Sequence, residues 1–190
     1  MKIILASNSP RRKELLAGLE LPFEVRVLSG IDERYPDTLH GEEIPRYISA
    51  QKARAYLPTL ADDELLITAD TVVMLEGRVL GKPHDHEDAI RMLTDMSGRT
   101  HEVITGVTLA TLERQHSFAS VSRVTFAQLS HEDILHYVDH YRPFDKAGAY
   151  GIQEWIGYIG VTRIEGSYFN VMGLPVQRLY EELRQFTHSL

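Results

Sequence analysis

A single stretch near the start of the chain decides the fold: Ile3-Ile4-Leu5-Ala6-Ser7-Asn8-Ser9-Pro10-Arg11-Arg12-Lys13-Glu14-Leu15-Leu16. Its first part, Ile3 to Ala6, is a continuous apolar run, which is typical of a strand that is covered on both faces. Small polar residues follow at positions 7–9, and Leu15 and Leu16 belong to the apolar face of a helix. The stretch therefore predicts a buried strand, a tight polar turn and a helix in direct succession.

The turn has the chemistry of an anion site. Ser9 is a suitable N-cap and Pro10 a suitable first helical residue, so the free backbone N–H groups of the helix point into the loop. Residues 11–13, Arg-Arg-Lys, place cations in the first helical turn, where the helix dipole disfavours them unless an anion is bound. A solvated basic turn, balanced by Glu14, is the alternative, and these residues alone do not decide between the two.

Composition limits the class of protein. A length of 190 residues suits one domain, residues 1–190, which is long enough for a sizeable core and for two lobes. The net charge of -7 argues against a general nucleic-acid binder, so any polyanion site must be a local cluster. The absence of cysteine rules out disulfides, thiolate metal sites and a cysteine nucleophile. No apolar run approaches a signal peptide or a membrane span, so we expect a soluble, cytoplasmic protein without a membrane partner.

Helical and strand patterns are intermixed along the chain. The patterns predict helices near residues 10–19, 45–56, 85–97, 130–141 and from 176 onward, and strands near 3–6, 23–28, 65–75, 78–80, 103–112, 117–126, 158–164 and 168–172. The strands at 103–112 and 117–126 are expected to form an antiparallel hairpin. We therefore expect an α/β fold with a mixed, partly antiparallel sheet flanked by helices.

Asp70 is the most unusual residue of the predicted core. It interrupts the apolar strand 65–75, and burying a carboxylate without a partner is costly. A salt-bridged structural aspartate is one interpretation, and a general base or metal ligand is the other. Lys82, in Gly81-Lys82-Pro83, follows the next turn and could return toward Asp70, although an ordinary surface lysine would have the same pattern.

Further charged residues have an ordinary and a functional interpretation. Asp32 and Glu33 lie in a long acidic loop, residues 29–43, where they are either solvated or join Asp70 in holding Mg²⁺, which prefers oxygen ligands. Lys52 lies in a predicted helix, where a solvated face is the default interpretation.

Familiar catalytic motifs are absent. The sequence contains neither GxxxxGK[ST] nor GxGxxG, so it has no P-loop and no dinucleotide-binding fingerprint. It also lacks GxSxG and HExxH, which argues against a serine hydrolase of that type and leaves a zinc site weakly supported. Lys146 precedes a glycine-rich run, residues 147–151, that can come close to a ligand or can simply be flexible. An anion site, scattered lysines and two or three acidic residues together indicate phosphate chemistry.

Six short segments, spread in order over nearly the whole chain, carry a resemblance to a known family. They are Leu5-Ala6-Ser7-Asn8-Ser9-Pro10-Arg11-Arg12, Ala69-Asp70-Thr71-Val72-Val73, Gly81-Lys82-Pro83, Ser97-Gly98, Asp145-Lys146-Ala147-Gly148-Ala149-Tyr150-Gly151-Ile152-Gln153 and Val171-Met172-Gly173-Leu174-Pro175. As a set they resemble the Maf family of nucleotide pyrophosphatases. The resemblance implies a mixed α/β fold with two lobes around a cleft, similar to inosine triphosphate pyrophosphatases. It also implies metal-dependent hydrolysis of a nucleoside triphosphate to the monophosphate and pyrophosphate, by a homodimer.

The resemblance also implies roles for individual residues. Asp70 matches the catalytic acid/base of the family, with Lys52 and Lys82 as catalytic lysines that handle phosphate. Glu33 matches an acidic loop residue, so Asp70 and Glu33 would hold the divalent cation, Mg²⁺ or Mn²⁺. The substrate-binding residues would be Ser7, Arg11, Arg12, Thr71 and Gln153. Asp32 departs from the family pattern, because relatives often carry a second glutamate there, and this leaves open which carboxylate meets the metal.

Three positions resemble one branch of the family. Arg11, Thr71 and Gln153 match the branch that hydrolyses dTTP and UTP, and modified pyrimidine nucleotides with them. The branch that acts on 7-methyl-GTP typically has Ser-Pro-Trp-Arg, Ser-Asp-Gln and a serine-rich segment in the corresponding motifs. The alternatives are a Maf pyrophosphatase with another base preference, such as 7-methyl-GTP, and a nucleotide-sensing regulator of cell division.

Overall fold

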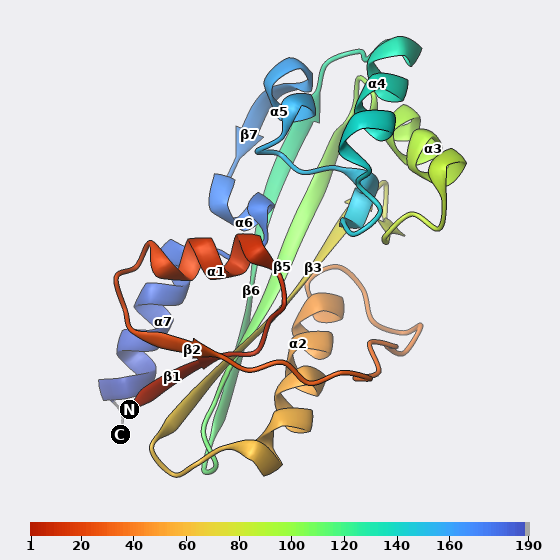
Figure 1. The fold of residues 1–190 in the computed structure, drawn as a ribbon. Coiled ribbons are helices and arrows are strands. Elements are labelled where there is room, and N and C mark those ends of the chain that lie inside the picture. Colours follow the sequence, from red (N-terminus) through yellow and green to blue (C-terminus); the bar gives the residue numbers. More distant parts are fainter. Residues whose placement is uncertain (189–190) are drawn as a thin grey trace. The chain divides into compact units, whose positions relative to one another are not determined.

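A computed structural model describes residues 1–188 (Figure 1). The chain divides into two compact units. Unit 1 comprises Met1–Thr71, Thr105–Ser120 and the residues from Gly173 onward, and unit 2 comprises Val72–Ile104 and Val121–Met172. A single domain over residues 1–190 stays a prediction, and its residues 189–190 lie outside the described part of the chain.

The described residues form one sheet and a set of helices. The strands are β1 (Lys2–Leu5), β2 (Phe23–Val25), β3 (Glu64–Leu75), β4 (Arg78–Leu80), β5 (Thr100–Ala110), β6 (Gln115–Phe126) and β7 (Val161–Glu165). The α-helices are α1 (Pro10–Ala17), α2 (Glu43–Tyr56), α3 (His86–Met96), α4 (His131–Tyr141), α5 (Trp155–Gly160), α6 (Tyr168–Met172) and α7 (Val176–His188). Short 3₁₀ helices are η1 (Leu57–Thr59) and η2 (Ala147–Ala149).

The sheet is mixed, as the sequence predicts. Its strand order is β2-β1-β3-β5-β6-β7, and β4 pairs with β3 outside this path. The strand β1 runs parallel to both β2 and β3, whereas the pairs β3–β4 and β6–β7 are antiparallel. The prediction of an α/β fold with a mixed, partly antiparallel sheet and flanking helices is confirmed. The cleft expected between two lobes stays a prediction.

Unit 1 is built around β1 and the first part of β3. Ile4 and Leu66 are fully buried, and with Ala53 and Tyr56 of α2 they belong to one apolar cluster. In Figure 1, α2 lies on one side of these strands, and α1 and α7 lie together on the other. Because both faces of the strands are covered, their apolar runs are continuous rather than alternating.

Unit 2 has a larger apolar core. Leu93 and Met96 of α3, Tyr137 of α4 and Phe126 of β6 are almost completely buried in it. A capping box starts the helix predicted at 130–141, because the Ser130 hydroxyl accepts from the Asp133 N–H at 3.0 Å and the Asp133 carboxylate accepts from the Ser130 N–H at 3.2 Å. Local signals therefore place α4 correctly.

The strand predicted at 168–172 is wrong, because this segment is the helix α6. Ser167 precedes it, and its hydroxyl accepts from the backbone N–H of Asn170 at 3.3 Å, as an N-cap does. The buried Asn170 side chain then donates to the Val103 carbonyl at 3.1 Å and to the Ser122 hydroxyl at 3.0 Å. A short apolar run does not distinguish a helix from a strand, and here a tertiary contact of one polar side chain accompanies the helix.

Other predicted boundaries shift without changing the type of element. The predicted strand 158–164 begins later, at Val161, because residues up to Gly160 belong to α5. The strand predicted at 23–28 extends only over Phe23–Val25. A hairpin turn at Glu76-Gly77, with positive φ angles of 51° and 79°, joins the two strands predicted at 65–75 and 78–80.

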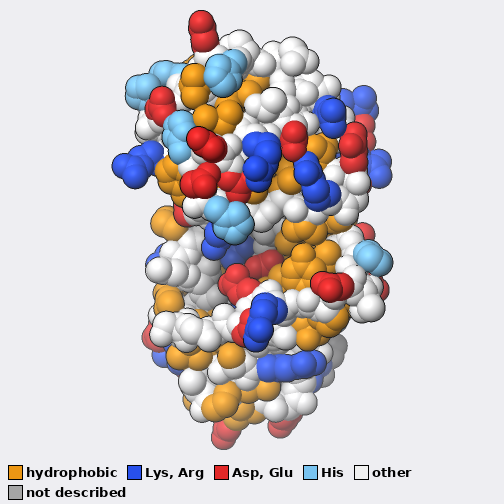
Figure 2. Space-filling view, turned by 90° about the vertical axis from the view of Figure 1, so that its right-hand side faces the viewer, with side chains coloured by type: hydrophobic (Ala, Val, Ile, Leu, Met, Phe, Trp, Pro, Cys, Tyr) orange, Lys and Arg blue, Asp and Glu red, His pale blue; other side chains and the backbone are white. Residues whose placement is uncertain are grey.

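The surface carries charges of both signs. Figure 2 shows lysine and arginine side chains interspersed with aspartate and glutamate on the visible face, with hydrophobic side chains between them. Within the described part of the chain, no helix is long and apolar enough to cross a membrane.

Candidate active site

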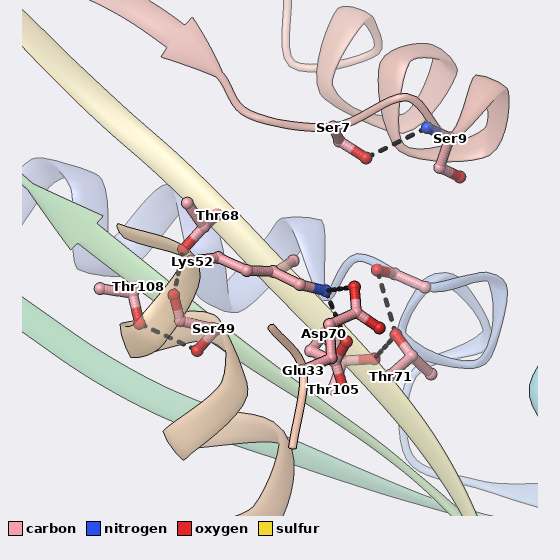
Figure 3. Close-up of polar contacts among 12 residues, drawn as sticks. Ser7, Ser9, Glu33, Ser49, Lys52, Thr68, Asp70, Thr71, Thr105 and Thr108 are labelled. Carbon is pink, nitrogen blue, oxygen red and sulfur yellow. Dashed lines mark hydrogen bonds and ion pairs between the residues drawn. The ribbon is translucent and has the colours of Figure 1, made fainter. Parts of the chain in front are cut away.

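The loop between β1 and α1 forms as the sequence predicts. The Ser7 hydroxyl accepts from the backbone N–H of Ser9 at 3.2 Å, which tightens the turn (Figure 3). Ser9 is the N-cap of α1, with its hydroxyl 3.5 Å from the N–H of Arg12, and Pro10 is the first helical residue. This confirms the local geometry from which an anion site at the helix start was inferred, while the anion itself stays a prediction.

Arg12 ties three separate segments of unit 1 together. Its Nε donates to the Gly173 carbonyl at 2.8 Å, its Nη1 to the Ala69 carbonyl at 2.8 Å and its Nη2 to the Thr71 hydroxyl at 3.1 Å. Burial lowers the pKa of the guanidinium, and the negative charges of Asp70 and Glu33 act in the opposite direction. Arg12 therefore binds both neighbours of Asp70, the carbonyl of Ala69 and the hydroxyl of Thr71, a structural role that the predicted role in phosphate binding did not include.

Asp70 and Glu33 share one ammonium group. Lys52 Nζ lies 2.7 Å from Asp70 Oδ1 and 2.9 Å from Glu33 Oε1 (Figure 3). The Asp70 and Lys52 side chains are each 14% exposed, whereas Glu33 is half-exposed. The carboxylate in the apolar strand thus has a partner, and a second carboxylate leaves the group with a net negative charge. A purely structural ion pair does not need that second carboxylate.

The remaining oxygen of Asp70 points away from this pair. No hydrogen bond to Asp70 Oδ2 occurs among the residues that the structure describes. A carboxylate oxygen in that state can accept a proton from a water molecule or bind a cation. The site can therefore perform either of the two chemical roles that the sequence suggested for Asp70.

The position of Lys52 follows from close packing of α2 against the sheet. A Cβ atom on Gly106 of β5 would lie 2.2 Å from the carbonyl carbon of Pro45, so only glycine allows this approach. Farther along the helix, Ser49 shares a hydrogen bond of 2.9 Å with Thr108 of β5, and its carbonyl accepts from Thr68 of β3 at 2.7 Å (Figure 3). These contacts hold the helix one turn before Lys52.

The two acidic loop residues have different partners. Asp32 binds the guanidinium of Arg34, with Asp32 Oδ2 2.7 Å from Arg34 Nη2, and the hydrogen bonds from Arg34 lower the pKa of Asp32. Glu33 instead reaches the Lys52–Asp70 pair. The structure therefore favours Glu33 over Asp32 as the second carboxylate of the site.

The carboxylates of Asp70 and Glu33 suit a hard divalent cation. Mg²⁺ is commonly bound by one or two carboxylates together with water and substrate phosphates, and this donor set matches that description. Among residues 1–188, no group of three or more histidine, aspartate or glutamate side chains is arranged to hold a metal ion. The site fits a cation that is held partly by substrate rather than by a complete protein cage.

Two predicted site residues belong to unit 2, and their roles beside Asp70 stay predictions. Lys82 is exposed, two residues after β4. Gln153 follows η2 in the glycine-rich segment, and its side-chain Oε1 is buried without a hydrogen-bond partner among the described residues.

Two other predicted substrate-binding residues lie in unit 1. The Thr71 hydroxyl accepts from Arg12 and also shares a hydrogen bond of 2.9 Å with Thr105. Arg11 is partly buried in the first turn of α1.

Sequence reasoning missed two contributors to the unit 1 site. The Gly173 carbonyl accepts from Arg12, and Thr105 binds Thr71. Gly173 lies in one of the six segments that carry the family resemblance, but the sequence did not predict its hydrogen bond from Arg12. Thr105 lies within a long apolar strand and carries no local signal, because only the pairing of β3 with β5 brings it to Thr71.

Comparisons with known proteins show what this chain is similar to. The family described as Maf-like protein matches residues 2–186. A dTTP/UTP pyrophosphatase of Phocaeicola vulgatus is 64% identical over 184 residues, which cover 97% of this chain and 95% of the relative. A dTTP/UTP pyrophosphatase of Porphyromonas gingivalis is 54% identical over 190 residues, covering 99% of this chain and 96% of the relative.

A more distant likeness comes from solved structures. A nucleoside-triphosphatase / dITP/XTP pyrophosphatase from Mycobacterium abscessus aligns with 68% of this chain and 76% of its own, with 19% identity and a TM-score of 0.40. A likeness of that size is too weak to carry an argument about the site.

Proposed function

This chain belongs to the Maf-like protein family, and from that premise we propose that it hydrolyses dTTP and UTP, and modified pyrimidine nucleotides, to the monophosphate and pyrophosphate. The relatives that match it over nearly their whole length are named dTTP/UTP pyrophosphatases. Their similarity supports the same activity in this chain.

One observation of the structure carries the proposal. Asp70 and Glu33 converge on Lys52, and Arg12 binds the residues on both sides of Asp70, at the Ala69 carbonyl and the Thr71 hydroxyl. A general base in a phosphoryl-transfer site must be held in place and stay charged, and it needs cations nearby for the phosphates. This cluster meets those requirements within a single unit.

The reaction that these residues support is hydrolysis at the α-phosphorus. Asp70 Oδ2 takes a proton from a water molecule whose oxygen forms the new bond to the α-phosphorus. The bond from that phosphorus to the oxygen shared with the β-phosphate breaks, and its electron pair leaves with the pyrophosphate. Lys52 and the guanidinium of Arg11 supply positive charge, and backbone N–H groups at the start of α1 can donate to phosphate oxygens.

Asp70 and Glu33 are the residues that would hold a divalent cation, Mg²⁺ or Mn²⁺. When bound, such a cation neutralises phosphate charge and stabilises the charge that develops in the transition state. The half-exposed position of Glu33 leaves room for water and substrate oxygens around it.

We propose that the side-chain amide of Gln153 recognises the base of the nucleotide. Uracil and thymine present an N3–H donor between two carbonyl acceptors, and a glutamine amide can accept from the N–H and donate to one carbonyl. The unpartnered Oε1 of Gln153 is the acceptor that this pairing requires. Thr71 and Arg11 complete the set of residues that resembles the dTTP/UTP branch.

Two further features go with the proposal. We propose that the protein is a homodimer, which size-exclusion chromatography with light scattering would test. We also propose a cytoplasmic location, because the nucleotides that it would hydrolyse are substrates of nucleic acid synthesis.

The decisive experiment is a nucleotide panel. Pyrophosphate release from dTTP, UTP, dCTP, dATP, dGTP and 7-methyl-GTP would be measured with Mg²⁺, with Mn²⁺ and with a chelator. We expect dTTP and UTP to lead, and the chelator to abolish turnover. Equal turnover of dCTP and dTTP, or a preference for 7-methyl-GTP, would contradict the proposed base preference. Nucleotide binding without any hydrolysis would instead indicate a sensor.

A further inference from the structure

Gln153 lies in a tight turn that is closed by its own backbone. The N–H of Glu154 donates to the carbonyl of Gly151 at 3.0 Å. Ile152 and Gln153 are therefore the two middle residues of a four-residue turn, which is called the Gln153 turn below. A buried amide oxygen without a donor is costly, so the unpartnered Oε1 of Gln153 is a group that a ligand would satisfy.

A single hydroxyl group holds both ends of the Gln153 turn. The Oη atom of Tyr137, on α4, accepts from the backbone N–H of Gly151 at 3.0 Å and donates to Oε2 of Glu154. Tyr137 is completely buried. Its pKa is raised by burial and by the hydrogen bond to Glu154, so the hydroxyl keeps the proton that it donates.

The carboxylate of Glu154 is itself held in place. Its Oε1 lies 3.2 Å from Nζ of Lys146, and Lys146 Nζ lies 2.8 Å from Asp145 Oδ1. The Lys146 side chain is 10% exposed, so its charge compensates the carboxylate in a largely water-free place. Glu154 therefore offers Tyr137 a fixed acceptor.

No spare volume lies beside the Gln153 turn at Gly151. A Cβ atom on Gly151 would lie 3.0 Å from Cδ of Glu154 and 3.2 Å from Cε of Lys146. A side chain at Gly151 would therefore displace the end of the Glu154 or Lys146 side chain.

We propose that Tyr137 is a positioning residue for base selectivity. It acts through Gln153, and the inference rests on the proposed function of Gln153 as the reader of the pyrimidine. A glutamine amide can rotate by 180° to pair with cytosine, so recognition of uracil and thymine requires that the amide is held in one place against one set of neighbours. Tyr137 supplies that constraint at the backbone, because its hydroxyl joins the first and last residues of the Gln153 turn.

The test is the variant Tyr137→Phe, which keeps the ring and removes the hydroxyl. We expect the ratio of kcat/KM for dTTP over dCTP to fall about tenfold, an effect of the size that loss of a single hydrogen bond produces. The change should lie mainly in KM, because Tyr137 is not among the residues proposed to perform the chemistry. Amide hydrogen exchange over residues 147–155 should become faster in the same variant, without any nucleotide present.

A matched control separates this role from general stability. Tyr56 is also a buried tyrosine, and its hydroxyl likewise accepts from one backbone N–H, of Leu28 at 2.7 Å, and donates to one carbonyl, of Arg26 at 3.2 Å. Tyr56→Phe should lower stability to a similar extent and leave the ratio of dTTP to dCTP unchanged. A ratio that falls equally in both variants would overturn the inference.

A second variant covers the case in which Tyr137→Phe does not fold. Gly151→Ala places a methyl group against the carboxylate of Glu154, which must move away and so weakens its hydrogen bond from Tyr137, and the variant should lower the same ratio. An unchanged ratio in a folded Tyr137→Phe or Gly151→Ala protein overturns the role of Tyr137 and leaves the proposed function standing. A wild-type protein without preference for dTTP over dCTP overturns the proposed function, and the inference with it.

Discussion

The cluster around Asp70 and the Gln153 turn are built from opposite kinds of chemistry. Around Asp70, charged groups are paired directly, with Lys52 between two carboxylates and a guanidinium on the neighbouring backbone. In the Gln153 turn, the neutral Tyr137 hydroxyl joins the backbone N–H of Gly151 to the carboxylate of Glu154. That carboxylate in turn forms an ion pair with Lys146. The first arrangement suits a phosphate, which every nucleotide has, and the second suits the edge of one base.

The difference predicts that rate and selectivity can be changed separately. Ionic groups stabilise charge that develops in the transition state, whichever base is attached. A neutral amide discriminates because the wrong base leaves polar groups unpaired. Variants of the Asp70 cluster should therefore slow all substrates alike, and variants of the Gln153 turn should change their ranking.

The largest effect is expected from Asp70→Asn. The change keeps the shape and removes the base, which should lower kcat by about 10²–10⁴-fold for every nucleotide and leave their ranking unchanged. The protein should stay folded, because Lys52 keeps Glu33 as a partner at 2.9 Å. Steady-state pyrophosphate release and thermal unfolding would be measured together. The control is Asp62→Asn, at an exposed residue of the same unit. An Asp70→Asn protein that retains half of the activity would contradict the role of Asp70.

The next largest effect is expected from Arg12→Ala. It removes the hydrogen bonds to the carbonyls of Gly173 and Ala69 and to the Thr71 hydroxyl, which should lower the free energy of unfolding by about 2 kcal/mol. It should also lower kcat/KM by about tenfold or more, because the strand that carries Asp70 is no longer held. Urea unfolding and single-substrate kinetics with dTTP would measure the two effects.

Arg12→Lys separates charge from geometry. A lysine restores the positive charge but not the planar fork of donors that reaches three acceptors. We expect it to recover little of either loss. Full recovery by lysine would mean that Arg12 acts as a charge alone, and Arg54→Ala, at an exposed arginine of α2, provides the control for loss of a surface cation.

These expectations depend on contacts that no local pattern reveals. The N-cap at Ser9, the capping box at Ser130 and the hairpin turn at Glu76-Gly77 involve only neighbouring residues, and the Ser9 cap and the elements next to the other two were predicted from the sequence. The partners of Arg12 lie 57 and 161 positions away at Ala69 and Gly173, so they depend on the completed fold. Sequence therefore identified Arg12 as a candidate but assigned it only a role in phosphate binding.

The same distinction explains the secondary structure that was missed. Residues 168–172 are short and apolar, so their helix was not separable from a strand by periodicity. Asp70 was found because a charge in an apolar strand is unusual in any fold. Tyr137 was not found, because a tyrosine on the apolar face of a helix is a common core residue. Its hydrogen bonds with Gly151 and Glu154 can be seen only in the folded structure.

An effect on the ranking of substrates, with a smaller loss of rate, is expected from Gln153→Ala. Loss of two neutral hydrogen bonds to the base should reduce the ratio of kcat/KM for dTTP over dCTP by about 10–100-fold. The kcat for dTTP should fall much less than in Asp70→Asn. Competition assays with both nucleotides in one reaction would measure the ratio directly. A uniform loss of rate with an unchanged ratio would place Gln153 with the Asp70 cluster instead.

The smallest effect concerns a proton in the core of unit 2. His101 is 1% exposed, its Nε2 lies 2.7 Å from the Tyr150 hydroxyl, and its Nδ1 has no hydrogen-bond partner among the described residues. Burial lowers the pKa of His101 from 6.5 to about 4, because the charged imidazolium would lose its hydration in the core. Burial also raises the pKa of Tyr150, so that its hydroxyl stays neutral.

Between pH 6.5 and about 4 the unfolded chain binds a proton at His101 that the folded chain does not, so acidification through this range favours unfolding. From pH 7 to pH 5.5 this should lower the free energy of unfolding by about 1 kcal/mol, and the loss should continue until about pH 4 is reached. Urea unfolding of the wild type and of His101→Gln at several pH values would isolate the effect, because glutamine can bind Tyr150 but does not titrate. Equal slopes with pH in both proteins would mean that His101 is protonated in the folded state as readily as in the unfolded chain. A steeper slope in the wild type would mean that the buried, neutral His101 in the core of unit 2 limits stability in acid.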